Sequence, residues 1–538
     1  MNRMNKKQHK IITLLVIVVF ILAFMLGNRV FFRIDLTRDR VYTLSALSRN
    51  LHREIIDIMR ITYYVSDRLA SIHPAPEEIS GFLREYAAHS RGKIQFVRRD
   101  PARTGMARDI EMLGVNPQAF RIIENNEITT ATVYSGIVIE YLDRVEVLPF
   151  VLSLNTLEYD ITTRALFMAR GRDRILGVMV ADIAKSWHND FILLDTALNQ
   201  AGYRIRQIIP GDEIPDTLPV LFVLGGVEDL DEWALYRIDR YIQLGGRVLF
   251  AIEPLYMDLS AGLDVRHAMD QGLSAIVASY GAGILPALVL DRLSLNISYQ
   301  IRDNVSQTRT VPYPHWLALL EHNGNIHHPI TQRFAGINLY WASHLIVNPP
   351  DGIIAETLIT SSPDAWLQIQ NFHTNPEFSD LFELEAAQTR GQKIMAAAFS
   401  GIFPSAFRDF PKPVREGYGA ELPDLPAIAR PSRIVVVGDT DFASALMEIG
   451  QGEGMNLNFL VRTADWLGND DDIMNLRHGD RGRLDRIADE RTRWAVMNFS
   501  RNLNIIVMPL LIIITGIVVT GKRKKMTIGK KNAAGKST

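Results

Sequence analysis

The pattern of hydrophobic and polar residues predicts an apolar segment near each end of the chain and a long mixed segment between them. Ile11–Leu26 contains no charged residue, and together with Val30–Phe32 it is long enough to cross a bilayer. The second apolar run is Leu503–Thr520, in which Pro509 predicts a kink of the kind that membrane helices tolerate. A cleavable signal peptide is the alternative for the first run, but no small-x-small cleavage site follows it, which favours an uncleaved anchor.

Basic residues flank both predicted transmembrane helices, which we place at residues 11–32 and 503–520. Lysine and arginine gather in residues 1–10 and 521–538, and short basic tails mark the cytoplasmic side of a membrane. We therefore expect both tails in the cytoplasm, the two helices in the lipid bilayer, and everything between them outside the cytoplasm. The tail from Gly529 has five residues between its glycines where a phosphate-binding loop has four, so we interpret it as a basic tail.

Residues 33–172 predict a small N-terminal α/β domain. Ser45 stands in front of apolar residues at helical spacing that extend to Ile58, which predicts a helix with Ser45 as its N-cap. The strand-like run Ile61–Val65, a helical segment and a second strand-like run follow, in β-α-β order. Val133–Val151 adds a predicted hairpin.

Apolar runs typical of strands buried on both faces of a parallel sheet recur from residue 173 onwards, beginning with Arg174–Asp182. They alternate with helical segments in residues 173–285, one of which Asp231 is placed to cap, and a further strand followed by a helix begins residues 431–490. Between these parts, residues 286–430 are rich in turn residues and short strand candidates. We predict the α/β fold class, with a doubly wound domain in two parts that is interrupted by an irregular, β-rich insertion.

Composition and charge exclude several classes of function. The 47% hydrophobic content is sufficient for large cores, and 58 basic against 60 acidic residues provide no overall field that would attract nucleic acid, so we expect no nucleic-acid partner. The chain contains no cysteine, which excludes disulfides, thiolate catalysis and cysteine-ligated zinc.

Three blocks of sequence carry a resemblance to a known family: Asp35–Ser45, Gly225–Pro254, and Gly438–Phe442 followed by Asn456–Leu467. Their order and spacing, with a C-terminal span, resemble the auxiliary subunits of ABC-type transport systems, including the gliding-motility-associated auxiliary subunit. The resemblance implies a non-catalytic component of the bacterial cytoplasmic (inner) membrane that works outside the cytoplasm with a separate ATPase and a permease. It also implies a central domain similar in fold to class I glutamine amidotransferases.

Such amidotransferases present a nucleophilic cysteine on a sharp strand-to-helix turn, and this chain has no cysteine to place there. The serine counterpart, G-x-S-x-G, is also absent from the sequence. We therefore expect no catalytic residue and no cofactor, and a non-enzymatic function. The alternative is a membrane-bound extracytoplasmic hydrolase, or a binding protein, for cell-wall or glycan material.

Two aspartates, Asp439 and Asp441, follow a buried-looking strand, at the end of a parallel sheet where ligands bind. One interpretation is a divalent-metal site; the other, which we favour, is that either aspartate caps the helix that follows. Gly225, Gly226 and Glu253 end neighbouring predicted strands. The five residues together form our candidate ligand or partner surface.

Two further clusters invite a metal interpretation. His322, His327 and His328 lie close together in the sequence, but no carboxylate stands at a ligand-like interval beyond Glu321, which favours a polar loop over a zinc site. Asn469–Asp472 is acidic, but it lacks the alternating ligands and terminal glutamate of a calcium loop. We therefore predict no metal site.

Overall fold

A computed structural model describes residues 44–468, except for 125–126, 155, 172, 226–229, 259–262, 268–271, 302–303, 333, 371, 415–421 and 451. Both predicted transmembrane helices, both tails and the acidic run Asn469–Asp472 lie outside the described residues. Within the described part, no helix combines the length and the apolar character needed to span a bilayer.

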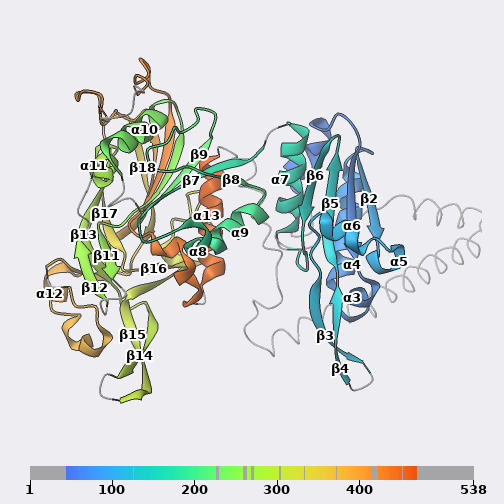
Figure 1. Ribbon diagram of the computed structural model, residues 1–538, viewed down its shortest axis with the longest axis horizontal. Coiled ribbons are helices and arrows are strands. Elements are labelled where there is room, and N and C mark those ends of the chain that lie inside the picture. The colour runs from blue at the N-terminus through green and yellow to red at the C-terminus, as the bar shows by residue number, and fades with distance from the viewer. Residues whose placement is uncertain are drawn as a thin grey trace, which may run out of the picture. The chain divides into compact units, whose positions relative to one another are not determined.

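The N-terminal part contains a four-stranded sheet in the order β2-β1-β5-β6 (Figure 1). The parallel pair β1 and β2 is joined through helix α4, and β5 and β6 form an antiparallel hairpin, as the sequence predicts. Helices α4 and α7 contribute apolar residues to its core, among them Leu83 and Leu166. The strands are Met59–Val65 (β1), Ile94–Arg99 (β2), Gln118–Glu124 (β3), Glu127–Val133 (β4), Ser135–Tyr141 (β5) and Arg144–Leu148 (β6). The helices are Ala46–Asn50 (α2), Leu51–Arg53 (η1), Asp67–Ile72 (α3), Ala75–His89 (α4), Pro101–Thr104 (α5), Ala107–Met112 (α6) and Leu157–Ala169 (α7).

The first predicted helix begins where expected but is much shorter. Ser45 is its N-cap, and the Ser45 hydroxyl accepts a hydrogen bond from the backbone N–H of Ser48 at 3.1 Å. However, α2 ends at Asn50, and Ile58 is 50% exposed instead of facing the core. The chain leaves the helix because Met59 must enter β1, whose pairing with β2 and β5 overrides the local helical pattern.

The second part is built on a seven-stranded sheet in the order β18-β20-β21-β10-β9-β7-β8. The strands β8, β7, β9, β10 and β21 are parallel, whereas β20 pairs antiparallel with β21, and β18 pairs antiparallel with β20. The strands are Ile175–Ala181 (β7), Arg204–Gln207 (β8), Val220–Gly225 (β9), Arg247–Ala251 (β10), Ile354–Thr360 (β18), Ile394–Gly401 (β20) and Ser432–Val437 (β21).

Helices cover both faces of this sheet, which makes it doubly wound (Figure 1). Alternate strand residues face opposite sides: Phe222 packs in the cluster with α9 and α13, whereas Val223 packs in the cluster with α10 and α11. Asp231 is the N-cap of α10, as the sequence predicts, and its carboxylate accepts a hydrogen bond from the N–H of Ala234 at 2.9 Å. The helices are Trp187–Asp190 (α8), Ile192–Gln200 (α9), Glu232–Gln243 (α10), Gly272–Ser279 (α11) and Glu453–Leu467 (α13).

Residues 286–430 are more closely integrated than an irregular insertion implies, because they supply β18 and β20 of the large sheet. Their other strands form two three-stranded sheets, β17-β13-β19 and β14-β15-β16, and the hairpin β11-β12 precedes them. The strands are Leu255–Asp258 (β11), Asp264–His267 (β12), Ala282–Leu290 (β13), Ser294–Ile301 (β14), Asn304–Leu320 (β15), Gly336–Tyr340 (β16), Ser343–Val347 (β17) and Trp366–Gln368 (β19). Short helices are Glu321–Asn323 (η2), Pro376–Leu381 (η3), Ala386–Thr389 (α12), Asp441–Ala443 (η4) and Ala445–Glu448 (η5).

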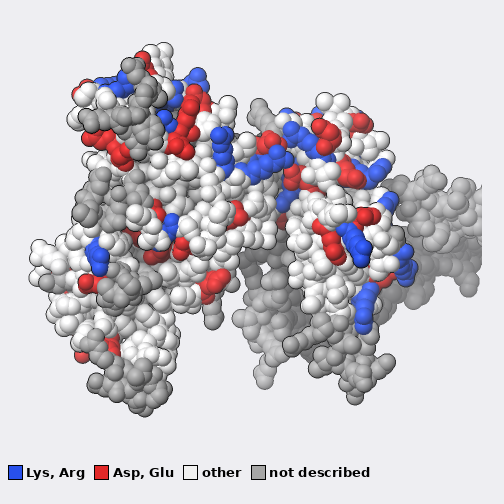
Figure 2. Space-filling view, viewed as in Figure 1, with Lys and Arg blue, Asp and Glu red and all other residues white. Residues whose placement is uncertain are grey.

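Charged side chains of both signs are interspersed on the face shown in Figure 2, where most basic groups have acidic groups beside them. This distribution agrees with the formal net charge of -2.

Candidate functional site

The carboxyl ends of β7, β9, β10 and β21 lie at one edge of the large sheet, because these strands are parallel. The chain runs from β7 to β8 on one side and then to β9 on the other, so the strand order reverses between β7 and β9. Ligands of doubly wound proteins bind at the strand ends beside such a reversal. Four of the sequence-predicted site residues, Gly225, Glu253, Asp439 and Asp441, end or follow the strands β9, β10 and β21 at this edge.

Gly225 ends β9 at this reversal, with a φ of 86° that favours glycine. A Cβ atom at this position would lie 2.8 Å from Cβ of Asp182 and 2.9 Å from the carbonyl oxygen of Ala181. Only glycine therefore lets the ends of β7 and β9 approach this closely. Gly226, the next predicted site residue, lies outside the described residues.

Lys185, in the loop after β7, is the centre of the charged groups at this edge. Its Nζ atom lies 2.9 Å from Oδ1 of Asp441, 3.0 Å from Oε1 of Glu253 and 3.2 Å from Oδ2 of Asp182. We call these four residues the Lys185 cluster. The Lys185 side chain is only 17% exposed, so the ion pairs join the ends of β7, β10 and β21 in a largely buried position.

The electrostatics of the Lys185 cluster keep the lysine charged. Burial alone would lower the pKa of Lys185, but the carboxylates of Asp441, Glu253 and Asp182 together raise this pKa well above its usual value. A lysine that retains its proton cannot act as a nucleophile or form a Schiff base. Burial raises the pKa of Glu253 to about 7, with Lys185 opposing the shift and Asp441 adding to it.

Asp439 and Asp441 have different surroundings, although they are only two residues apart. Asp439 is fully buried; its carboxylate accepts hydrogen bonds from the N–H of Tyr340 at 2.7 Å and of Phe442 at 3.2 Å. Burial, with the charges of Asp441 and Glu253, raises the pKa of Asp439 well above its usual value. The carboxylate that accepts from the backbone of η4 is that of Asp439, although Thr440 occupies the N-cap position of this turn. Asp441 is the first residue of η4, and its carboxylate pairs with Lys185.

The structure thus brings Glu253 and Asp441 into contact with one cation and places Gly225 beside Asp182. Reasoning from the sequence missed Lys185 and Asp182. The sequence did contain a signal for these two residues. Asp182 and Lys185 are opposite charges three residues apart, they follow directly after a buried strand, and the residues between them are apolar.

The three histidines that suggested zinc do not form a joint site. His322 and His327 are exposed, whereas His328 is buried, with its Nε2 atom 3.8 Å from Glu356. Burial lowers the pKa of His328 to about 4, and the nearby arginines act in the same direction. Across the described residues, no group of three or more histidine, aspartate or glutamate side chains is arranged to hold a metal ion.

Comparison with known proteins now identifies the family. The profile of the family described as "ABC-type uncharacterized transport system" matches residues 174–476, and that of a domain of unknown function matches residues 38–140. The chain belongs to this ABC-type transport system family, as the sequence resemblance predicts. A Borreliella burgdorferi protein, described only as uncharacterized, is 23% identical over 534 residues, which cover 97% of this chain and 100% of that protein.

Solved structures show only weak similarity. The mmIFT52 N-terminal domain is 13% identical, with a TM-score of 0.32, and the match covers 55% of this chain and 97% of that one. A putative thua-like protein from Parabacteroides merdae is 12% identical, with a TM-score of 0.28, over 56% of this chain and 91% of that one. Similarities this weak assign neither a fold nor a function.

Proposed function

We propose that this protein is a non-catalytic auxiliary subunit of an ABC-type transport system, anchored in the bacterial cytoplasmic membrane, with its body outside the cytoplasm. The family match over residues 174–476 carries this proposal, because it extends over the whole large sheet and both of its helical layers. A separate ATPase and permease would supply energy and the transport pathway. We also propose that the protein is related to the auxiliary subunit of gliding-motility systems, and that its central domain resembles class I glutamine amidotransferases in fold.

The Lys185 cluster supports a non-catalytic role. At the strand ends where a doubly wound enzyme would hold its reactive groups, this chain places a lysine whose proton is retained by three carboxylates. One lysine and three carboxylates join the strand ends, and structural ion-pair networks of this kind also shift pKa values without any catalytic role. We infer that the strand-end surface around Gly225, Glu253 and Asp441 contacts a partner or ligand rather than transforming a substrate.

We also propose the domain division that the sequence predicts, with a boundary near residue 172. Two separate apolar clusters support it: one contains residues from Leu44 to Met168, and the cluster containing Leu176 and Leu467 belongs to the large sheet. The two membrane helices would then carry both domains on the same side of the bilayer.

The decisive experiment is purification of the tagged full-length chain from gently solubilised membranes, with identification of the proteins that accompany it. We expect one ATPase and one multi-span permease in stable proportion. A matched sample lacking residues 503–538 should retain less permease if the second predicted helix contributes to docking. Recovery of the full chain without either partner would contradict the proposal.

The rival hydrolase hypothesis has its own test. The purified full-length chain is incubated with cell-wall and glycan polymers, and the release of soluble fragments is measured. We expect no release above that of a heat-denatured sample. Release that disappears in the variant Asp441→Asn would place chemistry at the strand ends and refute a non-catalytic role.

A further inference from the structure

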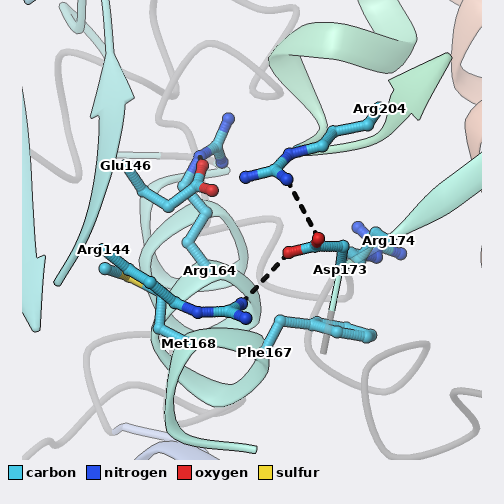
Figure 3. Close-up of a pocket in the computed structure, with 9 residues that line it drawn as sticks. Arg144, Glu146, Arg164, Phe167, Met168, Asp173, Arg174 and Arg204 are labelled. Atoms are coloured by element: carbon cyan, nitrogen blue, oxygen red, sulfur yellow. Dashed lines mark hydrogen bonds and ion pairs between the residues drawn. The ribbon is translucent and has the colours of Figure 1, made fainter. Parts of the chain in front are cut away.

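A small cleft distinct from the Lys185 cluster contains an unusual number of arginines (Figure 3). Its charged lining consists of four arginines and two acids: Arg144, Arg164, Arg174, Arg204, Glu146 and Asp173. The cavity has a volume of about 20 Å³, and it opens to solvent. A space of this size holds about one water molecule, or one atom of similar size such as chloride or a single oxyanion oxygen.

The acidic groups of the cleft are already engaged or poorly placed. Asp173 lies between two arginines and accepts from Arg144 at 3.0 Å and from Arg204 at 2.9 Å (Figure 3). The carboxylate of Glu146 lies 3.8 Å from Nε of Arg164, too far for a hydrogen bond. One carboxylate is thus shared by two guanidinium groups, and the other forms an ion pair with Arg164 without a hydrogen bond.

Arg164 is the group whose surroundings call for a ligand. Its side chain is only 2% exposed, and its Nη atoms donate to the carbonyl oxygens of Asp160 and Gln200. Its buried Nε–H has no hydrogen-bond acceptor among the residues that the structure describes. Burial lowers the pKa of Arg164; the carboxylates of Asp160, 3.9 Å from an Nη atom, and of Glu146 oppose this shift, and the positive charge of Arg174 adds to it. A buried donor of this kind is destabilising unless an acceptor reaches it.

We propose that this cleft binds a small anion, whose acceptor atom takes the Nε–H of Arg164 and whose charge is shared by Arg144 and Arg204. Chloride is similar in size to the cavity. Phosphate or a carboxylate would insert one oxygen and leave its remaining atoms toward solvent. Arg144 and Arg204, which Asp173 bridges, are more exposed there than Arg164 (Figure 3). This proposal does not depend on the transport function.

Binding would have a structural consequence. Arg164 belongs to α7, which packs on β5 and β6, whereas Arg204 begins β8 of the large sheet. An anion held by both would add an ionic connection between α7 and β8. Occupancy should therefore stabilise the folded chain, by mass action, as the anion concentration rises.

The test measures the unfolding temperature of the full-length chain at constant ionic strength, while gluconate, a carboxylate with a much bulkier body than acetate, is replaced by chloride, phosphate or acetate. The variants are Arg204→Gln, Glu146→Gln and the matched control Arg206→Gln, which removes the same charge from the same strand at a position outside the cleft lining. We expect a saturable rise in unfolding temperature for the natural protein and for the control. The rise should shrink severalfold in Arg204→Gln and reach half-saturation at severalfold lower anion concentration in Glu146→Gln.

The three anions distinguish the sources of the ligand. A response to chloride alone identifies a halide site, and a stronger response to phosphate or acetate identifies an oxyanion site; either supports the proposal. The proposal is overturned if all four proteins respond equally, or if the unfolding temperature does not depend on which anion replaces gluconate.

Discussion

Replacement of Lys185 by methionine tests whether the Lys185 cluster holds the strand ends together. The substitution keeps a similar volume but removes the cation that lies 2.9, 3.0 and 3.2 Å from three carboxylates. Removing one partner of a buried ion pair costs about 3–5 kcal/mol, because the remaining charge is left uncompensated. Since Lys185 is 17% exposed, we expect the lower end, a loss of about 3 kcal/mol in the free energy of unfolding at about pH 8.

The pH dependence of this loss follows from Glu253. Burial raises the pKa of Glu253 from 4.5 to about 7, so in this interval the folded state holds a proton that the unfolded state releases. The contribution of Glu253 to stability therefore falls as the pH rises from about 4.5 to about 7, by ~3 kcal/mol in total. Lys185 lowers the pKa of Glu253, so without Lys185 this fall should continue to higher pH. The penalty of Lys185→Met should thus be larger at about pH 8 than at about pH 5.

Urea unfolding followed by circular dichroism, at both pH values, measures these differences. The double variant Lys185→Met/Glu253→Gln serves as the matched control, because it removes the cation together with the most buried of its carboxylates. It should recover at least ~1 kcal/mol relative to Lys185→Met at about pH 8. The reasoning fails if Lys185→Met costs less than about 1 kcal/mol at both pH values, or if the double variant is no more stable than the single one.

Three further predictions concern other parts of the chain. Gly225→Ala should destabilise the folded protein by about 1–3 kcal/mol, because the φ of Gly225 is 86° and an added Cβ would lie 2.8 Å from Cβ of Asp182. Gly81→Ala, in α4 with free space around it, should instead stabilise the protein by about 0.5–1 kcal/mol. Thermal unfolding compares the two variants, and equal effects would contradict the strain argument. Asp465→Asn should lower the free energy of unfolding in urea by about 3 kcal/mol, because it removes the carboxylate that pairs with Arg174, whose side chain is 3% exposed. Asp173→Asn, between more exposed arginines, should lower it by less than about 1 kcal/mol. If Asp173→Asn costs more than Asp465→Asn, burial does not decide the contribution of these ion pairs. Reporter fusions at both termini should be cytoplasmic and a fusion near residue 300 extracytoplasmic; a cytoplasmic signal there would overturn the proposed topology.

Local patterns predicted the strands and helices of the large sheet well, because a strand buried on both faces must be apolar at nearly every position. The apolar runs in β7, β9, β10 and β21 are all strands of the observed sheet. Asp231 was recognisable as an N-cap because its hydrogen bond reaches only three residues along the chain, to Ala234.

Features that depend on distant residues were not predictable in this way. The helix expected after Ser45 is cut short because β1 is recruited by strands further along the chain. The position of β20 beside β21 depends on antiparallel pairing, for which the sequence carries no register signal. The Lys185 cluster requires Asp182, Glu253 and Asp441 to meet, and only the order of the strands brings them together.

Buried charge pairs connect the first and last sequence parts of the doubly wound domain at both ends of β7. At its carboxyl end, Lys185 contacts Asp441, which follows β21. At its amino end, Arg174 pairs with Asp465 of α13, and Tyr203 also donates to this aspartate. A long β-rich segment separates these partners in the chain, and apolar packing alone is tolerant of small displacements. Ion pairs with fixed geometry are less tolerant, so we infer that these buried charges specify how α13 and β21 dock on β7.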